Sequence, residues 1–196
     1  MQACLTREEI KNIDHIDAKM RETLKESRYR HTVSVSNTAA CLSFIYDVDL
    51  YETLISGRLH DCAKRYTDEE LLTKCEEKKI TISEVERLNP SLLHAKLGAY
   101  MAEHRYGITN ENVLSAIRYH TTGRPGMSNL EKIIFVADYI EPFRYHAPNL
   151  SELRQTAFKD INTALIMILK QTLDYLKYND FLIDEMTQKT YDYYTS

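Results

Sequence analysis

Histidines and aspartates that continue apolar helical patterns are the residues of this sequence best suited to chemistry. Asp138 is the clearest case, because it follows the apolar run 133–137 (IIFVA) with no break in the helical pattern. An ionised carboxylate buried there without a partner would cost several kcal/mol, so it must be paired, protonated or bound to a metal. Partners are likewise expected for His31, His60, Asp61, His94 and His120, which lie on or beside apolar helical patterns.

A single metal site would satisfy several of these groups at once. Adjacent residues on a helix project about 100° apart, so His60 and Asp61 could both hold one ion. His31 and Asp138 would reach that ion from neighbouring helices. A shell of imidazoles and carboxylates suits iron, manganese or zinc, and it lacks the thiolates of a structural zinc site. We therefore predict a divalent metal bound by His31, His60, Asp61 and Asp138.

Lys64 directs this prediction toward phosphate chemistry. It follows closely after His60 and Asp61, so its amine can reach the same face of a helix. A metal ion beside an ammonium group is what a phosphoryl oxygen needs as charge develops in the transition state. We expect Asp61 and Lys64 to act in catalysis. His94 and His120 either complete a second metal site bridged by Asp61 or contact phosphate as unligated imidazoles.

Helices are expected to position these residues. Glycine and proline number only 5 and 4 in 196 residues, which favours long helices over many short strands. Caps and breakers predict one helix that opens at Thr6, another that opens at Thr67, and further helices over about 27–46, 50–66, 91–106, 110–120, 131–140 and 150–178. The predicted fold is all-α. It has an N-terminal helix packed on the domain (1–26), a single helical bundle (27–178) and a C-terminal helical extension (179–196) with no clear core face.

Charge and composition exclude several classes of partner. The net charge is −4 and the sequence pI is about 6.0, so no global attraction to nucleic acid or to an anionic membrane is expected. The first twelve residues do not resemble a signal peptide, and the apolar stretches are too short to span a bilayer. The four cysteines form no C-x-x-C pair, which favours a reducing cytoplasm.

The order of these residues resembles the HD-domain superfamily of metal-dependent phosphohydrolases, and within it the bacterial YqeK family of symmetrical diadenosine tetraphosphate hydrolases. Residues 28–33 (RYRHTV) look like the first-histidine motif of that family, and 59–64 (LHDCAK) look like its HD-x-x-K segment. Residues 94–99 (HAKLGA), 116–123 (AIRYHTTG) and 131–142 (EKIIFVADYIEP) are similar to its later motifs. The resemblance covers most of the chain, from about residue 28 to about residue 174.

The resemblance implies an all-α HD-domain bundle that hydrolyses diadenosine tetraphosphate at the middle of its phosphate chain to give two ADP, with iron as the metal. It implies that the metal is bound by His31, His60, Asp61 and Asp138. It also implies that His94, His120, Thr121 and Arg144 face the nucleotide phosphates. Together with His31, Lys64 and Asp138, these four are the expected substrate-binding residues. The chain departs from the family at 183–187 (IDEMT), where relatives tend to carry Ile-His-Pro-x-Thr.

Several alternatives remain open at this level. The histidines could be satisfied core residues beside a buried salt bridge. The same scaffold could serve another nucleotidase, a cyclic-nucleotide phosphodiesterase, a two-iron oxygenase or a non-catalytic nucleotide sensor. The number of ions, one or two, and assembly into a homodimer are also left open. His15, His104 and His146 are expected at the surface.

Overall fold

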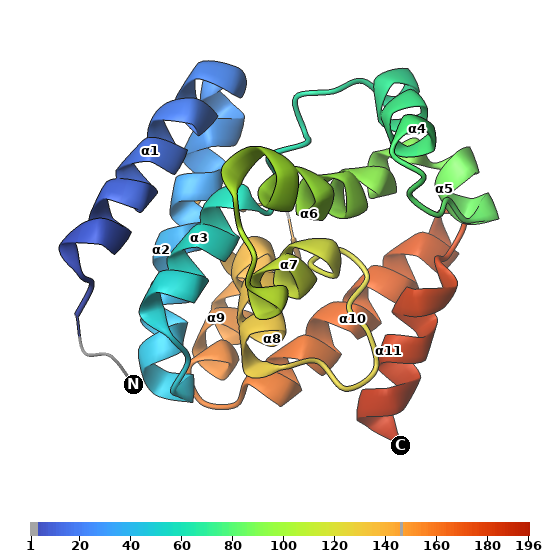
Figure 1. The fold of residues 1–196 in the computed structure, drawn as a ribbon. Helices are drawn as coiled ribbons and strands as arrows, with labels where there is room; N and C mark the ends of the chain where they lie inside the picture. Colours follow the sequence, from blue (N-terminus) through green and yellow to red (C-terminus); the bar gives the residue numbers. More distant parts are fainter. Residues whose placement is uncertain (1–3, 146) are drawn as a thin grey trace.

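The computed structural model describes residues 4–145 and 147–196, and His146 lies outside them. Helices connected by loops and turns build this part of the chain, and no strand occurs in it (Figure 1). The α-helices are α1 (Arg7–Thr23), α2 (Glu26–Tyr46), α3 (Leu50–Leu59), α4 (Asp68–Glu77), α5 (Glu84–Leu88), α6 (Leu93–Tyr106), α7 (Glu111–Arg118), α8 (Asn129–Ile140), α9 (Leu150–Ala157), α10 (Ile161–Tyr178) and α11 (Glu185–Thr195), with a 3₁₀ turn η1 (Pro90–Leu92) before α6. The all-α prediction is confirmed.

Local capping chemistry sets where many of these helices begin. Thr6, Thr67, Ser83 and Ser128 each form a capping box with a glutamate three residues later. Such caps satisfy backbone N–H groups that have no partner inside the helix, and each contributes about 1 kcal/mol. Gly107 ends α6 in the left-handed conformation, with φ of 71°. The helix starts predicted at Thr6 and Thr67 are therefore confirmed.

The core lies where α2, α3, α7 and α8 pack against one another. α8 is buried on most of its surface, and its core side chains include Ile133, Ile134 and Val136. α2 contributes Val35, Ala39 and Leu42 to the same cluster. Because α8 is surrounded by other helices, a polar residue near its end is brought against side chains from α2 and α3.

Gly57 marks a very close approach between α2 and α3. A Cβ atom at this position would lie 2.5 Å from the Cα of Ser36, whereas a Cβ at Gly98 in α6 would meet nothing nearer than 3.4 Å. We expect Gly57→Ala to lower the free energy of unfolding by about 1–3 kcal/mol, because backbone must move to admit the methyl group. Gly98→Ala is the matched control and should cost less. Urea denaturation of both variants measures the difference, and equal losses would contradict this account.

Two predicted helices are wrong at their C-terminal ends. α3 ends at Leu59, and the following residues form turns in which Cys62 N–H donates to the Leu59 carbonyl and Lys64 N–H donates to the Asp61 carbonyl. His60 and Asp61 therefore leave from a turn instead of a continuous helix. His120 likewise lies in a turn, just after the end of α7.

The long helix predicted over 150–178 is also wrong, because it is divided into α9 and α10. The Asp160 carboxylate accepts hydrogen bonds from the backbone N–H groups of Asn162 and Thr163 and so begins a new helix. The short α5 was not predicted, although Ser83 and Glu86 carry its capping signal.

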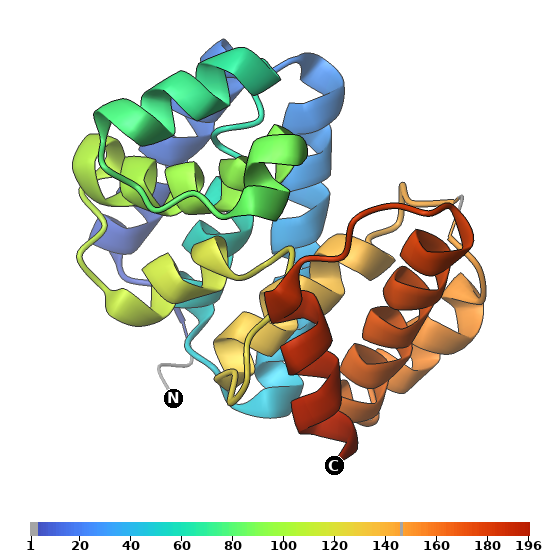
Figure 2. The same ribbon diagram turned by 90° about the vertical axis from the view of Figure 1, so that its right-hand side faces the viewer.

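The C-terminal extension forms the helix α11, which lies beside α10 (Figure 2). Thr187 and Thr190 are buried on its inner face. The Tyr194 hydroxyl accepts a hydrogen bond from the Met127 backbone N–H, 2.7 Å away, and so joins α11 to the loop before α8. In the described residues, none of the helices combines the length and apolar character that crossing a membrane requires.

Candidate metal centre

Four imidazole rings and two carboxylates meet where α2, α3, α6, α7 and α8 converge. His31 comes from α2 and Asp138 from the last turn of α8. The rings form a chain, with centroid distances of 5.4 Å from His31 to His60, 4.9 Å from His60 to His120 and 5.0 Å from His120 to His94. The structure thus brings together residues that are spread over more than a hundred positions of sequence.

Asp61 lies at the centre of this group. Its Oδ2 is 3.8 Å from Nε2 of His31 and 3.6 Å from Nε2 of His60. Its Oδ1 is 3.2 Å from Nε2 of His94 and 3.7 Å from Nε2 of His120. One carboxylate therefore contacts both the predicted ligand set and the two histidines of the alternative second site.

Asp138 faces two of the same imidazoles. Its Oδ1 is 3.0 Å from Nε2 of His31 and 4.0 Å from Nε2 of His60. Arg144 donates from Nη2 to that oxygen at 3.3 Å and from Nε to the Asp138 backbone carbonyl at 3.2 Å. The prediction that the carboxylate after the apolar run must be partnered is confirmed.

Backbone carbonyls orient three of the four imidazoles. Nδ1 of His60 faces the Gly57 carbonyl at 2.8 Å, and Nδ1 of His120 faces the Ile117 carbonyl at 2.7 Å. Nδ1 of His94 makes the equivalent contact with the Ser91 carbonyl. A carbonyl can only accept, so each Nδ1 carries the proton and each Nε2 presents its lone pair to the centre.

The donor set fits a divalent metal ion. Nε2 of His60 is buried and has no hydrogen-bond partner among the described residues. Two groups of atoms lie close enough to share an ion, His31 with His60 and Asp138, and His60 with Asp61 and His120, each within 4.8 Å of one another. Neutral imidazole nitrogens beside carboxylate oxygens form a typical site for a catalytic divalent metal.

Electrostatics keeps two of these groups in the form that binds metal. Burial lowers the pKa of His60 to about 4, so this imidazole is neutral at physiological pH. Burial by itself would raise the pKa of Asp61, but the surrounding histidines, His60 first among them, outweigh burial and hold the pKa well below its ordinary value. A neutral imidazole and an ionised carboxylate need release no proton to bind a cation.

The pKa of His31 shifts the other way, because this ring is less buried than His60 and Asp138 lies closer to it, 3.0 Å from Nε2. Burial would lower its pKa, yet the hydrogen bond and charge of Asp138, with the charge of Asp61, raise it above the ordinary value. A proton on His31 can balance part of the carboxylate charge when no cation is bound. Metal binding at this histidine must therefore displace that proton.

Comparison with known proteins identifies the family. The HD domain family model matches residues 28–142, a span that contains all six members of the cluster. The chain belongs to the HD domain family. Two curated relatives carry the name symmetrical bis(5'-nucleosyl)-tetraphosphatase. The protein from Bacillus subtilis is 40% identical over 91% of this chain and 95% of its own length, and the one from Halalkalibacterium halodurans is 41% identical over 86% and 89%.

A solved structure supports the same fold. The crystal structure of a predicted HD superfamily hydrolase involved in NAD metabolism, from Clostridium acetobutylicum, superposes with a TM-score of 0.89. It is 37% identical, and the alignment covers 93% of this chain and 96% of that one. The helical arrangement of the HD domain described above is therefore shared by a protein solved by experiment.

Lysine and arginine side chains surround the carboxylates of this HD domain. Lys64 is half-buried in the turn after Asp61, where burial lowers its pKa although the charges of Asp61 and Asp138 oppose the shift. Arg28 pairs with Oδ2 of Asp61 at 2.7 Å while 41% of its side chain remains exposed. Together with Arg144, these side chains give the site three cationic groups that can face phosphate.

Arg28 and Glu141 belong to the site but were not predicted as site residues. Arg28 precedes His31 by one helical turn, so the spacing of three residues could have indicated a shared face. Glu141 accepts a hydrogen bond from Nδ1 of His31. In the sequence, only the position of Glu141 three residues after Asp138 could have indicated that it belongs to the site. Of the other histidines, His15 and His104 are exposed, as predicted.

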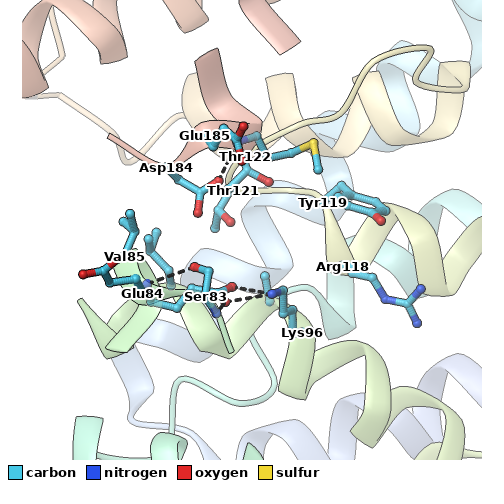
Figure 3. A pocket seen from close by; sticks show the side chains of 14 residues that line it. Ser83, Glu84, Val85, Lys96, Arg118, Tyr119, Thr121, Thr122, Asp184 and Glu185 are labelled. Atoms are coloured by element: carbon cyan, nitrogen blue, oxygen red, sulfur yellow. Dashed lines mark hydrogen bonds and ion pairs between the residues drawn. The ribbon is translucent and has the colours of Figure 1, made fainter. Parts of the chain in front are cut away.

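A cavity of about 340 Å³ opens next to the HD domain cluster. Thr121, which directly follows His120, lies in its wall beside Thr122 (Figure 3). Ser83 and Lys96 line the side formed by α5 and α6, and Asp184, at the start of α11, faces them from the tail. The segment that departs from the family pattern therefore forms part of this wall.

Proposed function

We propose that this HD domain protein is a metal-dependent hydrolase that cleaves diadenosine tetraphosphate symmetrically into two ADP. The observation that carries the proposal is the six-residue donor cluster around Asp61, in a chain whose curated relatives are named for this activity. A donor set that is buried but flanked by Arg28, Lys64 and Arg144 suits a polyanionic substrate.

The metal in this proposal is a divalent ion, with iron as the expected element. His31, His60, Asp61 and Asp138 would hold it. The site would hold one ion or two, and His94 and His120, whose rings face Oδ1 of Asp61, would hold the second. When bound, such an ion supplies a Lewis acid that lowers the pKa of water and draws charge from a phosphoryl oxygen.

The side chains of the site contribute charge and orientation to the reaction. Hydrolysis adds water at one of the two central phosphorus atoms, breaks the bond to the oxygen that links the two halves and leaves ADP on each side. Negative charge builds on the phosphoryl and leaving oxygens in this step. Lys64, Arg28 and Arg144 lie where they can neutralise that charge, and Thr121 lies at the wall of the adjoining cavity, which offers room for a nucleoside.

The test is a paired measurement of metal content and products. We expect protein purified without chelator to carry metal and to convert diadenosine tetraphosphate to ADP alone, and we expect Asp138→Ala to lose both. AMP plus ATP would contradict the symmetrical cleavage. Metal without turnover of this or related nucleotides would favour a sensor, and fully folded protein that binds no metal would overturn the site.

Lys64 should matter for rate more than for stability. We expect Lys64→Ala to lower kcat/KM about 100-fold, because a cation is lost beside the developing phosphoryl charge, while the free energy of unfolding changes by less than about 1 kcal/mol. Lys177→Ala, an exposed lysine on α10, is the control and should leave both unchanged. Steady-state kinetics and urea denaturation of the two variants test this. A Lys64→Ala protein that loses stability in proportion to rate would argue against a catalytic role.

The proposal also covers organisation and location. It divides the chain into an N-terminal helix (1–26), an HD domain (27–178) and a C-terminal tail (179–196), acting in the cytoplasm on a small nucleotide. Light scattering on the purified protein distinguishes a monomer from a homodimer.

A further inference from the structure

Glu141 is a buried carboxylate that contacts His31 but is not one of the six residues of the proposed metal centre. It directly follows α8 and is 3% exposed. Its Oε1 lies 3.3 Å from Nδ1 of His31. Its Oε2 accepts hydrogen bonds from the Ser34 hydroxyl at 2.7 Å and from the Phe143 backbone N–H at 2.8 Å. Both oxygens are thus engaged, and neither faces the centre itself.

The partner of His31 is chemically different from that of the other three imidazoles. His60, His94 and His120 lie at or near helix ends, and the Nδ1 of each contacts a backbone carbonyl three residues earlier. His31 lies inside α2, and its Nδ1 faces the carboxylate of Glu141, which follows the end of α8. A carboxylate accepts a hydrogen bond more strongly than a carbonyl does, and it makes the ring a better electron donor at its other nitrogen.

We infer that Glu141 is the positioning residue of His31. By accepting the Nδ1 proton it turns the Nε2 lone pair toward Asp61 and Asp138 and strengthens this imidazole as a metal ligand. The inference rests on the proposed metal site. It adds a residue that binds neither metal nor substrate but determines how tightly the metal is held.

The same contacts join the two helices that supply His31 and Asp138. Ser34 lies on α2 one turn after His31, and Glu141 follows Asp138 by three residues. Beyond Glu141, Arg154 Nη2 donates to the backbone carbonyls of Glu141 and Arg144, each at 3.0 Å. Glu141 therefore connects α2, the end of α8 and the loop that carries Arg144.

Glu141→Gln tests this role with little change in side-chain volume. A glutamine side chain has one accepting oxygen where the carboxylate has two. Its NH₂ group would therefore face either Nδ1 of His31 or the Ser34 and Phe143 donors, and that hydrogen bond would be lost. We expect the affinity for Co²⁺, measured by equilibrium dialysis and the visible spectrum, to fall about 10–100-fold. Raising the Co²⁺ concentration should restore much of the lost activity.

Glu131→Gln is the matched control, because Glu131, in the first turn of α8, is as deeply buried as Glu141. It is bound by Arg124, Ser115 and the Ser128 N–H, away from the histidines. This variant should lose stability but keep the Co²⁺ affinity. If Glu141→Gln fails to fold, Ser34→Ala replaces it. That change removes one of the two hydrogen bonds that hold Oε2 of Glu141 and should weaken Co²⁺ binding, though less than Glu141→Gln does.

Two failures can be told apart. If the wild-type protein binds no Co²⁺, or if Asp138→Ala binds it as well as the wild type does, the proposed metal site is wrong. If Asp138→Ala loses Co²⁺ but Glu141→Gln, or Ser34→Ala where the first does not fold, retains wild-type affinity, the metal site stands and the role of Glu141 is overturned. A loss of Co²⁺ affinity in Glu131→Gln equal to that in Glu141→Gln would likewise reduce Glu141 to a structural residue.

Discussion

Asp61→Asn will remove metal binding and hydrolysis together, with kcat/KM lower by about 1,000-fold or more. The asparagine has nearly the same shape, so the packing around it is kept. What it lacks is the charge that faces Nε2 of His60 and His94 and the Arg28 guanidinium. An amide oxygen is a weak ligand for a divalent cation compared with a carboxylate, and it cannot bridge two ions well. Metal content and product formation, measured on the same preparation, check this.

The control for Asp61→Asn is Asp17→Asn. Asp17 lies on α1, and its Oδ1 pairs with Nε of the largely buried Arg58, 2.6 Å away. Losing that pair leaves a buried guanidinium without its carboxylate and lowers the free energy of unfolding, but metal content should stay at the wild-type value. An Asp61→Asn protein that keeps its metal and its rate would remove Asp61 from the mechanism.

Removing the metal should have the second largest effect. The carboxylates of Asp61 and Asp138 face one centre, and a cation relieves their mutual repulsion. A metal at about 1,000 times its Kd stabilises the folded state by about 4 kcal/mol, which corresponds to a rise in Tm of about 8–16 °C for a chain of this size. Chelator-treated protein should therefore melt earlier and be inactive, and both properties should return with Fe²⁺ or Mn²⁺.

Asp138→Ala supplies the control for metal removal. Without this carboxylate, added metal should leave the melting temperature almost unchanged, while the helical fold persists. Calorimetry or circular dichroism gives the four melting temperatures needed, for wild type and variant, each with and without metal. Equal melting temperatures for the metal-free and metal-supplemented wild type would contradict a resident ion.

Much of the site could be predicted because burying a carboxylate or an imidazole on an apolar helical face costs free energy unless the group has a partner. Asp138 after a fully apolar run, and His31 on a core stripe, require partners whatever the fold. The structure places His31, His60, Asp61, His94, His120 and Asp138 in one cluster and puts Lys64, Thr121 and Arg144 beside it. The resemblance in motif order then indicated which chemistry such a cluster performs.

What the sequence determined by itself was local. Thr6 and Thr67 open helices because a side-chain oxygen bonds an N–H three residues away, and Gly107 ends one because it tolerates positive φ. The start of α10 is local as well, because Asp160 caps it. Only the tertiary structure decided that His60 and Asp61 leave from a turn and that Thr187 and Thr190 face the interior. It also decided that Arg28 and Glu141 join the centre. Apart from the three-residue spacing of Arg28 and His31, these features depend on how helices far apart in the chain pack together, and a local pattern of residues does not encode that packing.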